Sequence, residues 1–123
     1  MRLGQSFRIG ALSFAVLFAV AHAGEPQVID ARAQFTGGTW RFDVTVRHAD
    51  TGWEHYADAW RVVGPDGTVY GTRTLYHPHV EEQPFTRSLS GVRIPADVSS
   101  VRVESRDSVH GWGATTITVQ LER

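Results

Sequence analysis

The sequence predicts an all-β protein, specifically a seven-strand antiparallel sandwich of the immunoglobulin or fibronectin kind that follows a signal peptide. Three observations lead to this prediction. Apolar and polar residues alternate with a period of two after residue 24, which is typical of half-buried strands. Turn-forming residues interrupt the alternation at intervals of roughly ten residues, as they do in β-sandwiches. No later stretch carries the apolar stripe of an amphipathic helix. A small β-barrel is the alternative architecture.

Residues 1–23 have the organisation of a secretory signal peptide. Arg2 and Arg8 precede an apolar run over residues 11–21, and Ala21-His22-Ala23 provides a small-x-small cleavage signal. The run of about 11 residues is too short for a membrane span, which needs roughly 20. We therefore expect cleavage after Ala23, which leaves residues 24–123 as one β domain without a membrane anchor. The expected location is the periplasm or the outside of the cell.

The expected strands follow from the alternation and from the turns between them. In the second segment, Trp40, Phe42 and Val44 alternate with charged and threonine side chains. Trp60 should fill the buried aromatic position of the third strand. Pro65-Asp66-Gly67 predicts a tight turn between the third and fourth strands. The seven segments are 27–35, 39–48, 57–64, 68–76, 84–92, 99–106 and 114–122.

Composition excludes several classes of function. The chain has no Cys, so disulfides, thiolate metal sites and thiol nucleophiles are excluded, and its stability must rest on an apolar core. The formal net charge is −1 and no basic stripe is present, so nucleic acid is not an expected partner. Asp107, Ser108 and His110 are too close in sequence to form a typical triad. We therefore expect a protein that is not an enzyme.

The five histidines after residue 23 are expected at one end of the domain. In an antiparallel sandwich, the loops after the second, fourth and sixth strands lie at the same end, and every one of these histidines falls in or beside them. The sharpest local feature is His77-Pro78-His79. Pro78 favours an extended conformation of His77, and alternate side chains of an extended chain point the same way.

These histidines predict a site for a divalent transition metal, Zn²⁺ or Cu²⁺, because imidazole nitrogens suit both ions. A carboxylate could complete the site, and the candidates are Glu54, Glu81, Glu82 and Asp107. His48 is the poorest candidate, since packing at the end of a strand explains it. The predicted ligands are His77, His79, His110 and His55.

Aromatic residues in the same loops support a second interpretation. Trp53, Tyr56 and Trp112 would form the surface of a non-catalytic protein-interaction module, because Trp and Tyr are favoured anchors in binding patches. The alternative is that these rings close the open end of the sandwich. The two main interpretations are therefore a metal-binding domain and a domain that binds another protein.

Two segments of the chain carry a resemblance to known proteins. They are Tyr76-His77-Pro78-His79 with residues 82–87, and residues 107–113. The chain resembles a family of short, uncharacterised bacterial exported proteins, and the resemblance extends over most of residues 24–123. This family has no assigned activity, so the resemblance implies no catalytic or binding residues. It implies a Gram-negative periplasmic setting.

Overall fold

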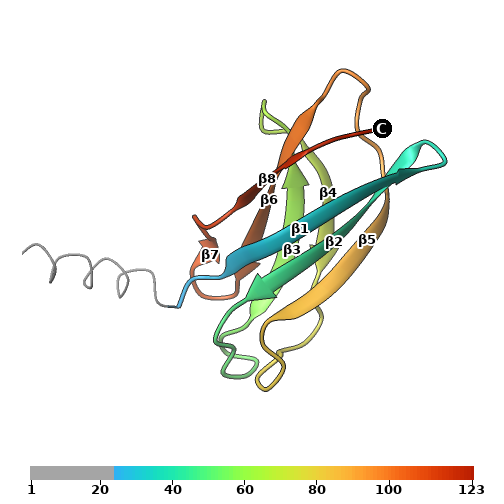
Figure 1. Cartoon of the computed structure of the whole chain (residues 1–123). Coiled ribbons are helices and arrows are strands. Elements are labelled where there is room, and N and C mark those ends of the chain that lie inside the picture. The colour runs from blue at the N-terminus through green and yellow to red at the C-terminus, as the bar shows by residue number, and fades with distance from the viewer. Residues whose placement is uncertain (1–23) are drawn as a thin grey trace, which may run out of the picture.

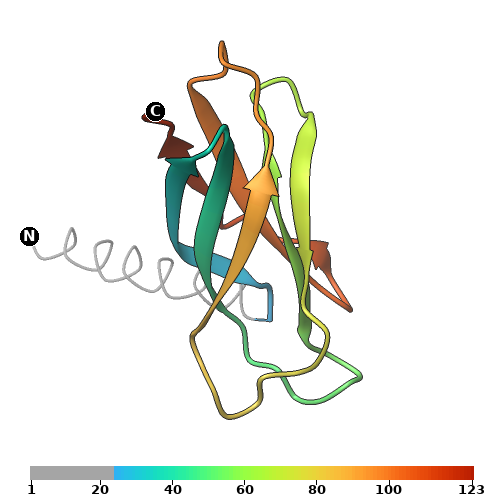
Figure 2. The same ribbon diagram turned by 90° about the vertical axis from the view of Figure 1, so that its right-hand side faces the viewer.

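A computed structural model describes residues 24–123, which form two antiparallel β-sheets around one apolar core. The smaller sheet has the strand order β1-β2-β5, and the larger has the order β4-β3-β6-β7, with β8 also paired to β6. Figures 1 and 2 show the two sheets facing each other. The expected signal peptide, residues 1–23, lies outside the described residues.

The structure confirms the all-β prediction, with eight strands in place of the seven expected. Six of the seven predicted segments agree with a strand to within two residues at each end. The additional strand is β7, a two-residue hairpin partner of the end of β6. Residues 24–123 contain no helix. These residues therefore include no helix that is long and apolar enough to cross a bilayer. The strands are β1 (Gln27–Thr36), β2 (Thr39–Arg47), β3 (Ala57–Val63), β4 (Val69–Thr74), β5 (Phe85–Val92), β6 (Ser100–Asp107), β7 (Gly111–Trp112) and β8 (Ile117–Gln120).

The core lies between the sheets and is built from alternate residues of each. Trp40 and Phe42 of β2 are buried, and Trp60 of β3 is completely buried at the position predicted for an aromatic residue. Val101 and Val103 of β6 complete the facing layer. Burying a large apolar side chain stabilises the fold by about 1.5–3 kcal/mol, so this layer holds the domain together without disulfides.

The predicted tight turn joins β3 to β4. The Gly67 N–H donates to the Gly64 carbonyl at 3.0 Å, and the Asp66 carboxylate accepts the Thr68 N–H at 3.0 Å. Gly67 has a φ of 91°, a conformation that costs other residues energy because of their Cβ atom. No atom lies within 4 Å of a Cβ placed there. The glycine is therefore required by the backbone conformation and not by packing.

Gly67→Ala should consequently lower the free energy of unfolding by about 1–2 kcal/mol, the cost of a left-handed conformation for a residue with a Cβ. Gly67→Asn should lower it less, because asparagine tolerates this conformation better. Urea denaturation of the three proteins measures both differences. Equal stability of the native protein and the alanine variant would contradict this assignment.

Three loops meet at one end of the domain, as the strand order predicts. The β2–β3 and β4–β5 loops lie side by side at the lower end of the ribbon in Figure 2, and the His79 N–H donates to Asp50 Oδ2 across them at 2.7 Å. The β6–β7 turn is joined to the β2–β3 loop by the Ser108 N–H, which donates to the Tyr56 carbonyl at 3.0 Å. These contacts place loop side chains from distant parts of the sequence next to one another.

Candidate metal centre

Asp107 is the centre of a cluster of ionisable side chains at this end of the domain. It is the last residue of β6, and its side chain is completely buried. Its Oδ1 atom accepts the backbone N–H of Val109 at 2.9 Å and that of His110. Such bonds from an Asp to the backbone two and three residues later are typical of a tight turn. They reverse the chain into β7 and fix the orientation of the carboxylate.

The second oxygen of this carboxylate faces three imidazole rings. Asp107 Oδ2 lies 2.9 Å from His48 Nε2, 3.1 Å from His55 Nε2 and 2.9 Å from His110 Nδ1. The side chain of His48 is 0% exposed, that of His55 is 23% exposed and that of His110 is 40% exposed. These four residues are called the Asp107 cluster below. It is closed at His48 and open to solvent at His110.

A second buried carboxylate lies behind His48. His48 Nδ1 is 2.5 Å from Asp50 Oδ1, and the ring is the donor because an ionised carboxylate only accepts. Asp50 is itself held by the Ala57 N–H, at 2.9 Å from Oδ1, and by the His79 N–H on Oδ2. A carboxylate that accepts the outer N–H of a histidine is the usual arrangement behind a metal-binding imidazole.

The number of hydrogens available in the Asp107 cluster is the main chemical feature of the site. With its Nδ1 hydrogen donated to Asp50, a neutral His48 has no hydrogen on Nε2. Yet that nitrogen lies 2.9 Å from Asp107 Oδ2 and 2.9 Å from the Gly24 carbonyl oxygen, both of which are acceptors. In addition, three ring nitrogens face one carboxylate oxygen, which offers about two lone-pair positions. Either an imidazolium at His48 or a bound cation satisfies this arrangement.

The spacing of these atoms suits a metal ion. His48, His55 and Asp107 each offer a ligand atom, and within residues 24–123 these three atoms lie within 4.8 Å of one another. With zinc bonds of about 2.0–2.1 Å, donors at neighbouring tetrahedral positions lie about 3.3 Å apart. The measured nitrogen–oxygen separations of 2.9 and 3.1 Å need to open by only a few tenths of an ångström.

Charge in the cluster is distributed between Asp107 and His110. Burial alone raises the pKa of the Asp107 carboxyl, but the hydrogen bonds from His110, His55 and the Val109 N–H outweigh burial and hold this pKa well below its usual range. The hydrogen bond to Asp107 raises the pKa of His110 above its ordinary value. A metal ion at the site would compete with the proton on His110, so metal affinity should increase with pH.

The raised pKa of His110 predicts a pH dependence of stability in the metal-free protein. A raised pKa adds stability that is fully present below the pKa of the unfolded chain, about 6.5, and is lost as the pH rises through the folded value. The native protein should therefore exceed His110→Gln in stability most clearly near pH 5, and the difference should shrink above about pH 6.5. Urea denaturation between pH 5 and 9 in the presence of a chelator measures it. A difference that grows with pH would contradict the pairing with Asp107.

The structure divides the four predicted histidine ligands between two places. His55 and His110 belong to the Asp107 cluster. His77 and His79 lie together in the β4–β5 loop, with ring centroids 4.7 Å apart, but His77 is exposed and His79 is buried. The Nε2 atom of His79 is 2.9 Å from the guanidinium of Arg87. Burial and this positive charge lower the pKa of His79, and the same charge opposes a cation at this nitrogen.

His48 and Asp107 are the two members of the cluster that sequence reasoning undervalued. His48 was expected only to pack at the end of a strand, and Asp107 was one of four candidate carboxylates. The spacing of His48 and Asp50, two residues apart directly after a strand, is the signal for a ring held by a carboxylate. The spacing of Asp107 and His110 is the corresponding signal for a turn that brings a ring back to the carboxylate.

The aromatic residues predicted to bind a partner differ in their surroundings. Trp53 is 66% exposed, and its ring packs edge-on against Tyr56 with centroids 5.6 Å apart. Trp112 carries the guanidinium of Arg61 at 3.8 Å from its ring centre. The exposed Trp53 and the half-buried Tyr56 therefore form an aromatic pair beside His55, whereas part of the Trp112 ring is covered by an intramolecular contact.

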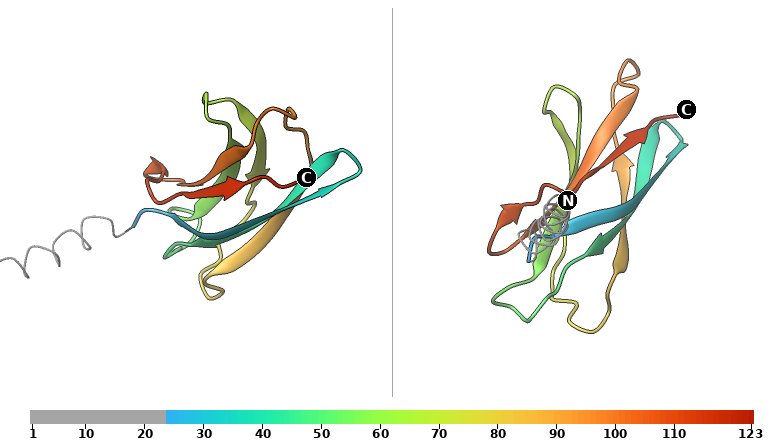
Figure 3. Two further views of the ribbon diagram at one scale, coloured as in Figure 1. Left: turned by 45° about the horizontal axis from the view of Figure 1, so that its top comes forward. Right: turned by 60° about the vertical axis from the view of Figure 1, so that its left-hand side comes forward.

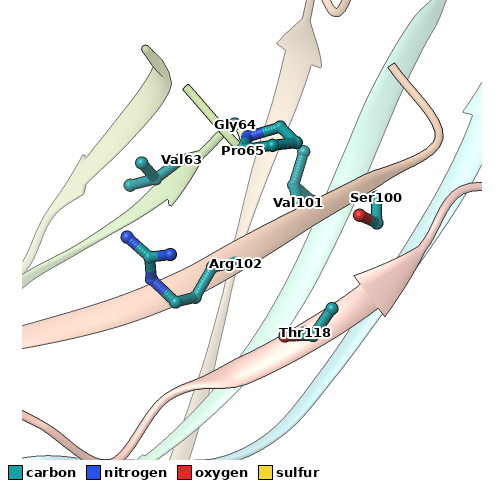
Figure 4. Close-up of a pocket in the computed structure, with 7 residues that line it drawn as sticks. All are labelled: Val63, Gly64, Pro65, Ser100, Val101, Arg102 and Thr118. Carbon is teal, nitrogen blue, oxygen red and sulfur yellow. The ribbon is translucent and has the colours of Figure 1, made fainter. Parts of the chain in front are cut away.

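A small pocket lies at the opposite end of the domain, away from the Asp107 cluster. It has a volume of about 90 Å³ and lies between the end of β3 and the start of β6, as Figure 4 shows. Sites for organic ligands usually have about 300–1,000 Å³. Arg102 is its only charged lining residue, so this pocket offers neither the volume nor the convergent polar groups of a ligand site.

Comparison with known proteins gives one relative and no family. Neither a protein-family model nor a solved structure matches the chain. The chain is 37% identical over 99 residues to a protein of the archaeon Halomicrobium mukohataei that carries the name "Putative lipoprotein". The match covers 80% of this chain and 48% of that protein, so the chain spans about half the length of its relative. Because the relative is archaeal, this similarity does not specify the bacterial periplasm implied by the resemblance.

Proposed function

We propose that this protein is a small exported domain that binds a divalent transition metal, Zn²⁺ or Cu²⁺, through His48 Nε2, His55 Nε2 and Asp107 Oδ2. One observation carries the proposal. Three imidazole nitrogens converge on one buried carboxylate oxygen, with fewer hydrogens than their contacts require if His48 is neutral. A cation at their centre replaces contacts between acceptors by bonds from each acceptor to the metal.

His110 completes the proposed site on its solvent side. Its Nδ1 atom faces the same oxygen, and its side chain is the most exposed of the cluster. An ion would enter past His110 and exchange its water ligands for the buried ligand atoms of His48 and Asp107. Asp50 would hold the His48 ring in place during this exchange. The proposed role is binding, with no reaction assigned to the site.

The proposed setting is the cell envelope or the outside of the cell. It rests on the leader pattern of residues 1–23, which would be removed to leave residues 24–123 as the functional domain. The name of the archaeal relative is consistent with an exported protein. Because this chain has no Cys, it has no residue for lipid attachment at the cut. The two facing sheets are proposed to be a sandwich of the fibronectin kind, in which β4 pairs with β3.

Calorimetric titration tests the proposal. Residues 24–123, prepared without a tag and stripped of metal by a chelator, should bind one equivalent of Zn²⁺ or Cu²⁺ with a Kd below about 10 μM. A ligand that binds the native state alone raises the Tm, by an amount that grows with its concentration. Mg²⁺ is the control, because imidazole is a poor ligand for it. The proposal fails if neither transition metal binds, or if Mg²⁺ raises the Tm equally.

The exposed Trp53, which packs on the half-buried Tyr56, supports a second candidate function, a surface that binds another protein. Trp53 is two-thirds exposed, whereas large aromatic side chains are usually well buried. A photoreactive residue at position 53 should form one discrete adduct with a protein of the native extract. The matched control is position 69, because Val69 is an exposed apolar residue on β4. Equal labelling from both positions would overturn this second candidate.

A further inference from the structure

Gly24 lies against the Asp107 cluster, although it belongs to neither sheet. Its carbonyl oxygen lies 2.9 Å from His48 Nε2, the nitrogen that also faces Asp107. A Cβ placed on Gly24 would lie 3.2 Å from Cε1 of His110, so the glycine backbone approaches that ring closely. Figures 1 and 3 show the start of the described chain beside β7. The backbone of residue 24 thus contacts two of the three imidazole rings.

The residues that follow hold Gly24 in this place. Pro26 is fully buried, and the Val28 N–H donates to the Thr115 carbonyl at 3.1 Å. A Cβ on Gly113 would approach the Pro26 carbonyl oxygen to 2.6 Å, so Pro26 lies directly against the segment between β7 and β8. The path of residues 24–28 is therefore fixed by packing and pairing.

The leader pattern predicts a cut between Ala23 and Gly24. This cut converts the Gly24 nitrogen from an amide, which is a poor metal ligand, into a primary amine. An α-amine has a pKa of about 7.7–8.0, so a metal can displace its proton near neutral pH. The amine nitrogen and the carbonyl oxygen of one residue can bind the same ion in a five-membered ring. Nitrogen-rich sites of this kind, with oxygen donors, suit Cu²⁺.

We propose that the α-amine of Gly24, created by removal of the signal peptide, is a ligand in the metal site together with the imidazoles of His48 and His55. This inference rests on the proposed function. Processing then completes the site, so the precursor, with an amide at residue 24, binds Cu²⁺ less tightly than the processed protein. Metal loading is thereby coupled to export.

The first test is the identity of the processed N-terminus. The full chain is expressed with its own leader, and the exported protein is isolated and weighed as an intact chain by mass spectrometry. The mass should be that of residues 24–123. A chain that retains the leader, or that begins at another residue, would overturn the inference.

The second test compares two forms of the domain that differ only at this end. One begins with Gly24, and the other carries Ser-Ala before Gly24, which leaves the sequence intact but moves the amine away. Cu²⁺ should bind the first at least tenfold more tightly. In electron paramagnetic resonance, Cu²⁺ in the first form should show one more nitrogen ligand. Equal Tm values of the metal-free forms establish that both are folded.

The outcomes separate this inference from the proposed function. Equal, tight Cu²⁺ binding by both forms overturns the role of the amine and leaves the histidine and aspartate site intact. If neither form binds Zn²⁺ or Cu²⁺, both proposals are overturned. In the form that begins with Gly24, His55→Ala should lower Cu²⁺ affinity further than the extension does. If His55→Ala has no effect, the amine binds copper outside the cluster and the inference fails.

Discussion

Asp107→Asn should lower the free energy of unfolding by about 3–5 kcal/mol in metal-free protein at pH 7, the usual cost of removing one partner from a buried charged pair. The carboxylate is completely buried and accepts contacts from three rings and two backbone N–H groups. Asparagine preserves its size but removes the charge that balances His110. For a domain of this size, a loss of 1 kcal/mol lowers the Tm by roughly 4–8 °C, so thermal and urea denaturation should both detect the change.

The pH dependence of this loss has a defined direction. Because the pKa of Asp107 is lowered in the fold, its stabilising effect is present above the unfolded value of about 3.9 and is lost as the pH falls through the folded value. Asp30→Asn is the matched control. It removes the same charge from an exposed pair with Arg32, and exposed pairs contribute about 0–1 kcal/mol. Equal losses in the two variants would contradict the central position of Asp107.

His55→Ala should lower the affinity for Zn²⁺ by about 100-fold or more. Loss of a residue that only orients a ligand costs about 10- to 100-fold, and loss of the ligand itself should cost at least as much. The side chain of His55 is 23% exposed, so the variant should still fold, and its Tm without metal verifies this. Calorimetry of the metal-free variant provides the measurement.

His77→Ala is the matched control for this variant. It removes an exposed imidazole from the β4–β5 loop, outside the Asp107 cluster, and should leave the Kd for Zn²⁺ within twofold of the native value. The opposite result, a large loss in His77→Ala and none in His55→Ala, would return the metal site to His77-Pro78-His79.

Most of the fold could be predicted because the signals for strands are local. The alternation that begins at Trp40 identifies the buried face of β2, and the turn at Pro65-Asp66-Gly67 separates β3 from β4. The end of the chain was predicted less well. One strand was expected over 114–122, but the paired segment β8 covers only Ile117–Gln120. The short strand β7 lies before the expected range, at Gly111–Trp112, where Gly111 has a φ of 81°.

The sequence predicted the end of the domain at which the candidate site lies, but not the set of residues that form it. Strand order alone places the three loops at one end, and this brings His55 and His110 together. The choice of His77 and His79 relied on local spacing, which carries no information about Arg87, eight residues after His79 in the chain and in contact with its ring. The burial of His48 against Asp107, 59 residues away, is a tertiary contact that sequence spacing does not reveal.

The most direct test of the metal site is a crystal of residues 24–123 grown with one equivalent of Zn²⁺, with diffraction recorded on both sides of the zinc absorption edge. The anomalous difference map should contain a single strong peak about 2.0–2.1 Å from His48 Nε2 and His55 Nε2, with Asp107 Oδ2 as a third ligand. A peak at His77 and His79, or no peak within bonding distance of Asp107, would contradict the account.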